Sequence, residues 1–305
     1  MPIDAPKSHS RGLLAGLGSY LLWGFFPLYF LAVAAASAQE VVAHRIVWTF
    51  ALAAAGVFLT GRRGRLVAVL RQRRLVGKLW LAGALVTANW SIYVWAVLND
   101  RLIDASLGYF VNPLVTVALA MAFLGERPRR LQLAALAVAS SAVVVIAVWY
   151  GQVPWVALLL ALTFGAYGLI KKQVDLDPLV GLAVETSPLA PFAAAFIVFL
   201  QATGAGTLTS AGPVHTVALL LAGVVTAAPL LLFAAAANRI PLSTLGLLQY
   251  ACPVLQFLLG VTVFAEPMPT ARWFGFGLVW LALAILTVDL LRPRAQTVQV
   301  SGPVT

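Results

Sequence analysis

SLGYFVNP, residues 106–113, runs on through an uncharged apolar segment to Glu126, and the chain contains a second version of this stretch. The second version reads TLGLLQYACP, residues 244–253, and leads through another apolar segment to Glu266. The spacing from proline to glutamate is equal in the two copies, which stand at an offset of 140. The Ser/Thr-Leu-Gly pieces match at an offset of 138, so one copy carries two extra residues. These matches predict an internal repeat.

Polar side chains also recur within the two copies. Each copy carries three of them at spacings of three and four residues, which places a trio on one face of a helix. The trios are Tyr109, Asn112 and Thr116 in the first copy and Gln249, Cys252 and Gln256 in the second. We expect both stripes to face the interior of a helix bundle, because amides exposed to lipid are costly. Cavity lining and hydrogen bonding between helices remain as alternatives for their role.

The composition is that of a membrane protein. Of the residues, 62% are hydrophobic and only 10% are charged, and the mean hydropathy is +0.95. Soluble domains are about half apolar and a quarter charged, so this class is excluded. The apolar residues fall in runs of about 20, the length that crosses a hydrocarbon core. Because lipid cannot satisfy free backbone groups, and because the runs are too long for barrel strands, each run is predicted to be a helix.

The runs predict an all-α integral membrane protein with ten transmembrane helices. The first run is too long for the apolar region of a cleavable signal peptide, so it is also read as a span. The predicted spans are 12–34, 41–60, 78–98, 103–124, 131–149, 153–170, 179–201, 215–237, 242–264 and 272–290.

The distribution of basic residues predicts the orientation. The net charge is +10, and the basic residues stand in short loops between apolar runs, which follows the positive-inside rule and not a nucleic-acid site. With an internal N-terminus, 17 of the 20 Lys and Arg residues fall on one side, and only Arg45, Arg101 and Arg272 fall on the other. Both termini are therefore predicted to be cytoplasmic. The basic segment from Arg62 to Lys78 is interpreted as a loop that faces lipid headgroups.

The predicted spans give the size of the repeat unit and the relative orientation of its two copies. The fourth span corresponds to the ninth, so the repeat unit is five helices, and an odd number of crossings inverts the second copy. We predict a first repeat at residues 11–149 and a second at 152–290, between cytoplasmic tails at 1–10 and 292–305. Inverted repeats are typical of secondary transporters, which bind substrate near the midplane between the repeats.

The chain resembles the RarD-type members of the EamA family, within the drug/metabolite transporter superfamily. The resemblance covers about residues 11–290, except for the loops 61–76 and 202–214. It rests on SYLLWGFFPLYF (19–30), Glu40 with His44-Arg45, Asn89-Trp90, WAVLND (95–100), ASLGYFVNPL (105–114), FLGER (123–127), YGLIKK (167–172), Glu185-Thr186 and LSTLGLLQY (242–250). It implies ten helices as two inverted EamA repeats around a central cavity, in the bacterial inner membrane. Family members are associated with chloramphenicol sensitivity, but the resemblance does not identify a substrate.

Glu185 is the sharpest candidate for a functional residue. It lies about six residues into its span, roughly 9 Å along the helix. Carboxylates inside a membrane are costly and are usually functional, so Glu185 is a candidate for proton coupling. The alternative is a structural ion pair with Lys171 or Lys172, which the predicted topology places on the same side.

Glu40, His44 and Arg45 lie at the external start of the second span. One hypothesis is that Arg45 faces the cavity, pairs with Glu40 and binds anionic groups of the substrate. The alternative is that Arg45 reaches to the headgroups. Histidine side chains ordinarily titrate near neutral pH, so His44 is a second coupling candidate, although a lone histidine is more often hydrogen-bonded at a helix end.

Prolines and aromatic residues complete the candidate site. Pro113 and Pro253 interrupt the helical hydrogen-bond ladder at matching positions and are candidate hinges. An aromatic cavity for planar or cationic molecules would draw on Trp23, Tyr29, Trp90, Tyr93, Trp95 and Tyr167. Aromatic residues near span ends also form interface belts, and Trp80, Trp155 and Trp273 are interpreted in this way.

These features predict a secondary active transporter of a small organic metabolite or drug-like compound, working by alternating access between the repeats. Export is favoured over import by the family resemblance alone. No nucleotide-binding loop or metalloprotease motif is present, and Cys252 is the single cysteine, so we expect no cofactor and no metal. The expected partners are the substrate, membrane lipids and a coupling proton, and a homodimer is left open. The alternative classes are an integral-membrane enzyme acting on a lipid or isoprenoid, and a channel or sensor.

Overall fold

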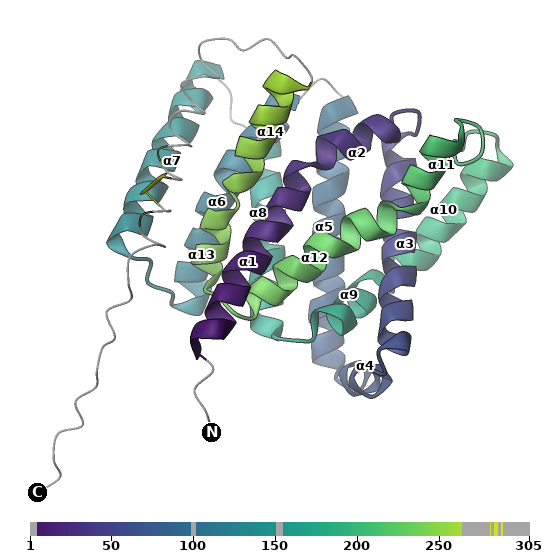
Figure 1. The fold of residues 1–305 in the computed structure, drawn as a ribbon, viewed down its shortest axis with the longest axis horizontal. Coiled ribbons are helices and arrows are strands. Elements are labelled where there is room, and N and C mark those ends of the chain that lie inside the picture. The colour runs from purple at the N-terminus through teal and green to yellow at the C-terminus, as the bar shows by residue number, and fades with distance from the viewer. Residues whose placement is uncertain are drawn as a thin grey trace, which may run out of the picture.

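The computed structural model describes residues 5–98, 102–150 and 155–263, together with Leu281, Ala284, Ile285 and Val288. The regular elements of this part are α-helices, and most of them run lengthwise through one bundle (Figure 1). The helices are α1 (Ala5–Gly24), α2 (Phe26–Ala32), α3 (Ala38–Leu59), α4 (Arg63–Leu70), α5 (Arg73–Leu98), α6 (Leu102–Leu124), α7 (Arg130–Tyr150), α8 (Trp155–Val174), α9 (Pro178–Thr186), α10 (Ala190–Ala202), α11 (Pro213–Leu220), α12 (Ala222–Ala237), α13 (Leu242–Leu248) and α14 (Ala251–Thr262).

The chain is an all-α membrane protein, as predicted. Each of the first nine predicted spans coincides with one helix or one pair of consecutive helices in the described residues. Five of these are long and apolar enough to cross a bilayer, and α9 with α10 makes a sixth if the pair counts as one span. Glu266, most of the predicted span 272–290 and residues 151–154 lie outside the described residues.

Several predicted spans are broken. The first breaks at Phe25 between α1 and α2, and the ninth breaks at residues 249–250 between α13 and α14. The seventh bends by 56° between α9 and α10. The predicted single helix at 179–201 is therefore wrong. Pro188 lies in this bend, and Pro191 stands in the first turn of α10, where its missing N–H costs nothing.

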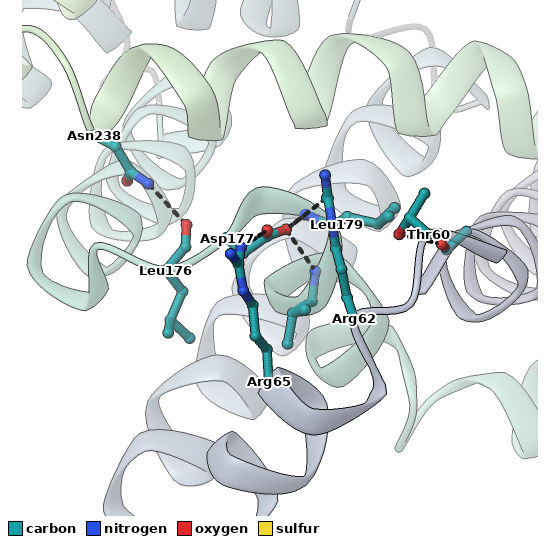
Figure 2. Close-up of polar contacts among 9 residues, drawn as sticks. Thr60, Arg62, Arg65, Leu176, Asp177, Leu179 and Asn238 are labelled. Carbon is teal, nitrogen blue, oxygen red and sulfur yellow. Dashed lines mark hydrogen bonds and ion pairs between the residues drawn. The ribbon is translucent and has the colours of Figure 1, made fainter. Parts of the chain in front are cut away.

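The predicted basic loop contains a helix of its own, α4, which lies at one end of the bundle (Figure 1). Leu66 and Val69 turn inward to the main core, whereas most of the remaining α4 residues are exposed. Two ion pairs hold α4 to the start of α9, from Arg62 and Arg65 to Asp177 (Figure 2). We call this end of the molecule the basic end, because Lys172 and Arg239 also lie there.

The two halves of the chain are interlocked. The most extensive helix packing joins residues before 151 to residues after it, above all α6 with α8, α5 with α8, and α1 with α12. Each of two contacts between the halves has a counterpart in which every helix is replaced by its equivalent in the other half. The packing of α1 on α12 matches that of α8 on α5, and the packing of α3 on α12 matches that of α9 on α5.

Two glycines set the closest approaches between these helices. A Cβ at Gly83 of α5 would overlap the carbonyl oxygen of Glu185 in α9. A Cβ at Gly223 of α12 would overlap the carbonyl group of Trp48 in α3. The two glycines stand at an offset of 140 from each other, which is the offset of the sequence repeat. Glycines at equivalent positions of the two halves therefore make close helix contacts, although their partners, Glu185 and Trp48, are not related by this offset.

Candidate functional site

A buried ion pair lies at the end of α9. Glu185 is 1% exposed and Lys171 of α8 is 6% exposed, and Lys171 Nζ lies 3.1 Å from Glu185 Oε2. The hydroxyl of Tyr167 donates to Glu185 Oε1 at 3.5 Å. We call these three residues the Glu185 cluster. Buried charges are tolerated only when they are paired and hydrogen-bonded, and this carboxylate is both.

The local sequence explains why this pair forms. Tyr167 and Lys171 are four residues apart on one face of α8, and Gly181 and Glu185 are four apart on one face of α9. A Cβ at Gly181 would lie 3.2 Å from Lys171 Nζ, so the glycine leaves room for the ammonium group. Lys172 points elsewhere and donates to the carbonyl oxygens of Ala237 and Ile240. Of the two predicted lysine partners, the structure assigns Lys171.

A second buried charge lies on α3. Arg45 is 4% exposed, and its Nε donates to Thr226 Oγ1 of α12 at 3.0 Å. Its guanidinium group lies 4.0 Å from the ring centroid of Trp90 and 5.4 Å from that of Phe26. We call these four residues the Arg45 cluster. The alternative in which Arg45 reaches to the headgroups is wrong, because the side chain is enclosed by α2, α5 and α12.

The two clusters lie along the same pair of helices. On α5, Gly83 touches Glu185 and Trp90 touches Arg45. On α12, Phe233 stacks on Tyr167 and Thr226 binds Arg45. Each pair of positions is seven residues apart, which is two turns on one face, or about 10 Å. The clusters are therefore stacked along the bundle, with the Glu185 cluster nearer to the basic end.

Aromatic side chains pack beside the Glu185 cluster. Trp23 of α1 contacts Tyr20, Phe164 and Phe233 with ring centroids 5.5 to 5.9 Å apart. The structure therefore brings together two of the predicted aromatic candidates, Trp23 and Tyr167, through Phe233. Trp90 belongs to the Arg45 cluster, and Tyr93 packs on a separate small core with Ala96, Val156 and Leu160.

The outer aromatic residues behave differently. Trp95 is 41% exposed and contacts Trp155, which is exposed to the same degree. Trp80 is also exposed. These positions fit lipid-facing or interfacial residues. Trp95 is therefore removed from the candidate cavity, whereas Trp80 and Trp155 stay with the predicted anchors.

Glu40 does not pair with Arg45, in contrast to the prediction. One carboxylate oxygen accepts from the backbone N–H of Thr207 at 2.7 Å and the other from its hydroxyl at 2.9 Å. Because the single hydroxyl proton of Thr207 goes to Glu40, His215 Nε2 must donate to that oxygen, 2.8 Å away. Glu40 therefore holds the connection between α10 and α11 at the end of the bundle opposite the basic end.

His44 is fully buried and faces this same region. Its Nδ1 accepts from Trp48 Nε1 at 3.0 Å, which places the proton of the neutral ring on Nε2. That Nε2 has no hydrogen-bond partner in the part of the chain that the structure describes, and neither has the buried hydroxyl of Tyr29. Among the described residues, therefore, only one of the two ring nitrogens of His44 is hydrogen-bonded, as the alternative interpretation expected for this residue.

The first polar stripe lies where α6 packs on α13, whereas the second is divided by the break between α13 and α14. Asn112 and Thr116 are buried and lie 3.4 Å apart through Oδ1 and Oγ1. A Cβ at Gly246 would lie 2.8 Å from Cγ2 of Thr116, so the helices are in close contact. Gln249 is buried, and its Oε1 has no partner among the described residues, as is also true of the hydroxyl of Tyr250. Gln256 is partly exposed. The side chain of Tyr109 lies outside the described residues.

The two candidate hinge prolines are not structurally equivalent. Pro113 lies inside α6, which continues through it. Pro253 lies in the first turn of α14, just after the break that follows α13. Only the second proline therefore accompanies an interrupted span.

Sequence reasoning missed Thr226, Thr207 and the break in span seven. Nothing in the local pattern marks either threonine, because each is identified only by a partner in a distant part of the chain, Arg45 for Thr226 and Glu40 for Thr207. The break had a visible signal in Ser187-Pro188. Among the described residues, no group of three or more His, Cys, Asp or Glu side chains has the geometry to hold a metal ion.

The long apolar helices are those of a multi-pass membrane protein, and the relatives place the chain in the transporter class. The chain is 45% identical over 290 residues to protein RarD of Streptomyces exfoliatus, covering 95% of this chain and 92% of that one. It is 42% identical over 283 residues to a protein of Vibrio cholerae named as an uncharacterized transporter, covering 92% and 93% of the two chains.

A solved crystal structure matches with a TM-score of 0.70 at 21% identity, covering 93% of this chain and all of that chain, which shows the fold alone. No family model matches the sequence. The chain belongs to the RarD family, whose members are EamA-type proteins of the drug/metabolite transporter superfamily. It is a membrane transporter and not an enzyme, so the lipid-enzyme alternative is set aside.

Proposed function

We propose that the chain is a secondary active transporter of a small organic molecule, working by alternating access. One observation carries this proposal. Two buried charged clusters are stacked in the bundle core on α3 and α9, and their central residues, Arg45 and Glu185, are related by the repeat offset of 140. Charges in a bilayer core are retained where they bind substrates or coupling ions.

The Arg45 cluster is the proposed substrate site. An arginine stacked on Trp90 presents a planar cation beside aromatic faces, a surface that suits an organic molecule with an anionic or planar aromatic group. Asn112, Gln249 and Gln256 are proposed to supply polar contacts, with Trp23, Tyr93, Tyr109 and Tyr167 supplying apolar surface. The buried Oε1 of Gln249 supports such a role, since a substrate donor would satisfy it.

The Glu185 cluster is the proposed coupling site. A proton that binds Glu185 would remove one charge of the ion pair and release Lys171, which changes the contact between α8 and α9. The bend after Thr186 lies directly beside this pair, so the change would act at an interrupted span. His44 is retained as a second candidate because its Nε2 is buried without a partner among the described residues.

The movement is proposed to occur at the broken spans. In the described residues, the helices of the proposed repeats at 11–149 and 152–290 pack extensively on each other, so separating the repeats as two rigid blocks would expose this packed surface. Motion of α9 against α10, or of α13 against α14, would open the substrate site to one side of the membrane at a time. It would leave more of the core packed than separation of the two repeats. Pro253 lies at the second of these breaks, which supports its role as a hinge; Pro113 is a weaker candidate.

The proposed location is the bacterial inner membrane, with both termini and the basic end in the cytoplasm. The positive-inside distribution of Lys and Arg supports this orientation. Export of a metabolite or drug-like compound is proposed over import, by family analogy. A homodimer is compatible with the proposal and is not required by it.

The test is transport by the purified protein in proteoliposomes. Ligands are first found by thermal stabilisation across a panel of metabolites and antibiotics, since binding to the folded state raises the unfolding temperature. We expect flux of the hit compound to depend on an imposed proton gradient. Arg45→Gln should abolish the ligand-induced shift, and Glu185→Gln should remove the gradient dependence.

Matched controls separate these effects from changes of net charge. Arg127→Gln and Asp175→Asn alter exposed residues at the basic end and should leave binding and flux unchanged. Gradient-independent conductance would favour a channel. Full activity of Glu185→Gln with an unaltered pH dependence would reject the coupling assignment.

A further inference from the structure

The segment between α3 and α5 carries a large unbalanced positive charge. Seven Lys or Arg residues stand between positions 62 and 78, and no acidic residue occurs from position 41 to position 99. Asp177 neutralises part of this charge from another element. It lies 3.0 Å from Arg62 and 2.9 Å from Arg65, and its Oδ1 also accepts from the first N–H groups of α9 (Figure 2).

Asp177 also fixes the position of α4. The helix is joined at its start to α9 by two charge-assisted hydrogen bonds, and Leu66 and Val69 anchor its inner face in the core. The opposite face, which carries Val67 and Leu70, is left exposed and held in a defined orientation.

Besides the two arginines that pair with Asp177, the segment carries five basic residues, and all five are exposed. None of them forms an ion pair with an acidic residue in the part of the chain that the structure describes. They are Arg63, Arg71, Arg73, Arg74 and Lys78. Together with the exposed Leu59, Val67 and Leu70, we call them the α4 surface. Arg63 lies 4.7 Å from the ring centroid of Phe58, so its charge is held beside an apolar patch.

The exposed apolar residues set the depth of this surface. Phe58 and Leu59 end α3 with 50% and 87% exposure, and Trp80 and Leu81 of α5 are 48% and 54% exposed. Such residues face lipid in a membrane protein. Arg74, Lys78 and Leu81 share one face of α5, so the position of Lys78 is only about 4.5 Å along the helix axis from that of the first lipid-facing leucine. The basic residues therefore lie at the level of the headgroups.

We propose that the α4 surface binds anionic phospholipid headgroups of the adjoining leaflet. Arginine side chains match the geometry of a phosphodiester, and apolar residues at the same depth match the acyl chains below it. The charge is complementary to an anionic lipid and has no acidic counterpart of its own within the segment. This inference is independent of the proposed transport activity, since it rests on α4 and not on the buried clusters.

The experiment compares lipids on the purified full-length protein. Nanodiscs of phosphatidylcholine, with and without phosphatidylglycerol, are used for thermal unfolding, and native mass spectrometry counts the lipids retained. We expect phosphatidylglycerol to raise the unfolding temperature and to be retained preferentially. The preference should weaken at high salt, because exposed charges are screened.

Variants locate the effect on the α4 surface. Arg73→Gln/Arg74→Gln should lower the affinity for phosphatidylglycerol about 25-fold, since each basic residue near an anionic surface contributes roughly fivefold. Arg73→Lys/Arg74→Lys should retain most of the affinity. Arg127→Gln/Arg130→Gln removes the same charge from exposed residues before and at the start of α7, and should change this affinity little.

Three outcomes would overturn the proposal. Equal losses in the two glutamine double variants would show a general charge effect. An unchanged affinity in Arg73→Gln/Arg74→Gln would exclude this surface. If inorganic phosphate or a polyglutamate peptide raises the unfolding temperature and phosphatidylglycerol does not, the α4 surface binds a soluble anion instead.

Discussion

Lys171 and Glu185 show how two charges can persist in an apolar core. Each is almost fully buried, and each satisfies the other, with Tyr167 as a second donor to the carboxylate. Removing one partner of such a pair leaves an uncompensated charge in a medium that solvates it poorly. The pair is therefore a structural requirement as well as the proposed coupling site, and the two roles can be separated by mutation.

A double-mutant cycle separates them. Lys171→Met alone should lower the free energy of unfolding by about 3–5 kcal/mol, because Glu185 is left buried and unpaired. Adding Glu185→Gln should recover much of this loss, because the uncompensated charge is gone. Thermal unfolding in detergent checks the stability, and flux through the double variant should no longer depend on the proton gradient.

The opposite result is equally informative. If Lys171→Met is as stable as the parent protein, the carboxylate has become protonated or has found another partner. If the stable double variant still transports with its gradient dependence intact, Glu185 is a structural residue only.

At the scale of elements, close helix contacts depend on glycines. Gly83→Ala should force α5 and α9 apart, since the new methyl group would overlap the carbonyl oxygen of Glu185. We expect destabilisation of about 1–3 kcal/mol, the range for overpacking. Gly77→Ala is the matched control on the same helix. Nothing lies within 4 Å of its Cβ position, so it should stabilise α5 by up to about 1 kcal/mol.

Thermal unfolding of both variants checks this prediction. Equal stability of the two would mean that α5 and α9 are not in contact at Gly83. Because the same contact adjoins the Glu185 cluster, Gly83→Ala should also reduce transport more than its loss of stability explains.

The start of α9 depends on one carboxylate. Asp177 accepts from Leu179 N and Val180 N and pairs with Arg62 and Arg65. Asp177→Ala should lower the free energy of unfolding by about 1 kcal/mol, because the helix cap is lost. The ion pairs should add little to this loss, because Arg65 is 70% exposed. Asp177→Ser retains a capping oxygen and should recover most of the loss, as measured by thermal unfolding. If Asp177→Ser is as unstable as Asp177→Ala, the ion pairs and not the helix cap account for the contribution of Asp177 to stability.

For the whole molecule, the orientation in the membrane is directly measurable. Cys252 is buried, so it contributes little labelling background. Gln72→Cys places an exposed thiol at the basic end, and Ser210→Cys places one at the opposite end. An impermeant maleimide should label Ser210→Cys in intact cells and Gln72→Cys only after lysis. The reverse pattern would overturn the proposed cytoplasmic basic end.

Span positions and membrane class were predictable from the sequence, because runs of about 20 apolar residues have no other stable arrangement in lipid. The repeat offset of 140 was also visible, as was the cost of burying Glu185. Which face of each helix turns inward was harder to predict. In a span that is apolar all round, periodicity carries little information, since lipid and protein core are alike as solvents.

The tertiary structure decided the partners. Arg45 lies against Thr226 and Trp90, Glu40 holds Thr207, and Lys171 rather than Lys172 reaches Glu185. These contacts join positions far apart in the chain, and they depend on how helices rotate and where they bend. The sequence by itself determined that buried charges must find partners in lipid. Only the packing of α3, α8, α9 and α12 determined which partners they found, because that packing sets which polar atoms come within hydrogen-bonding distance.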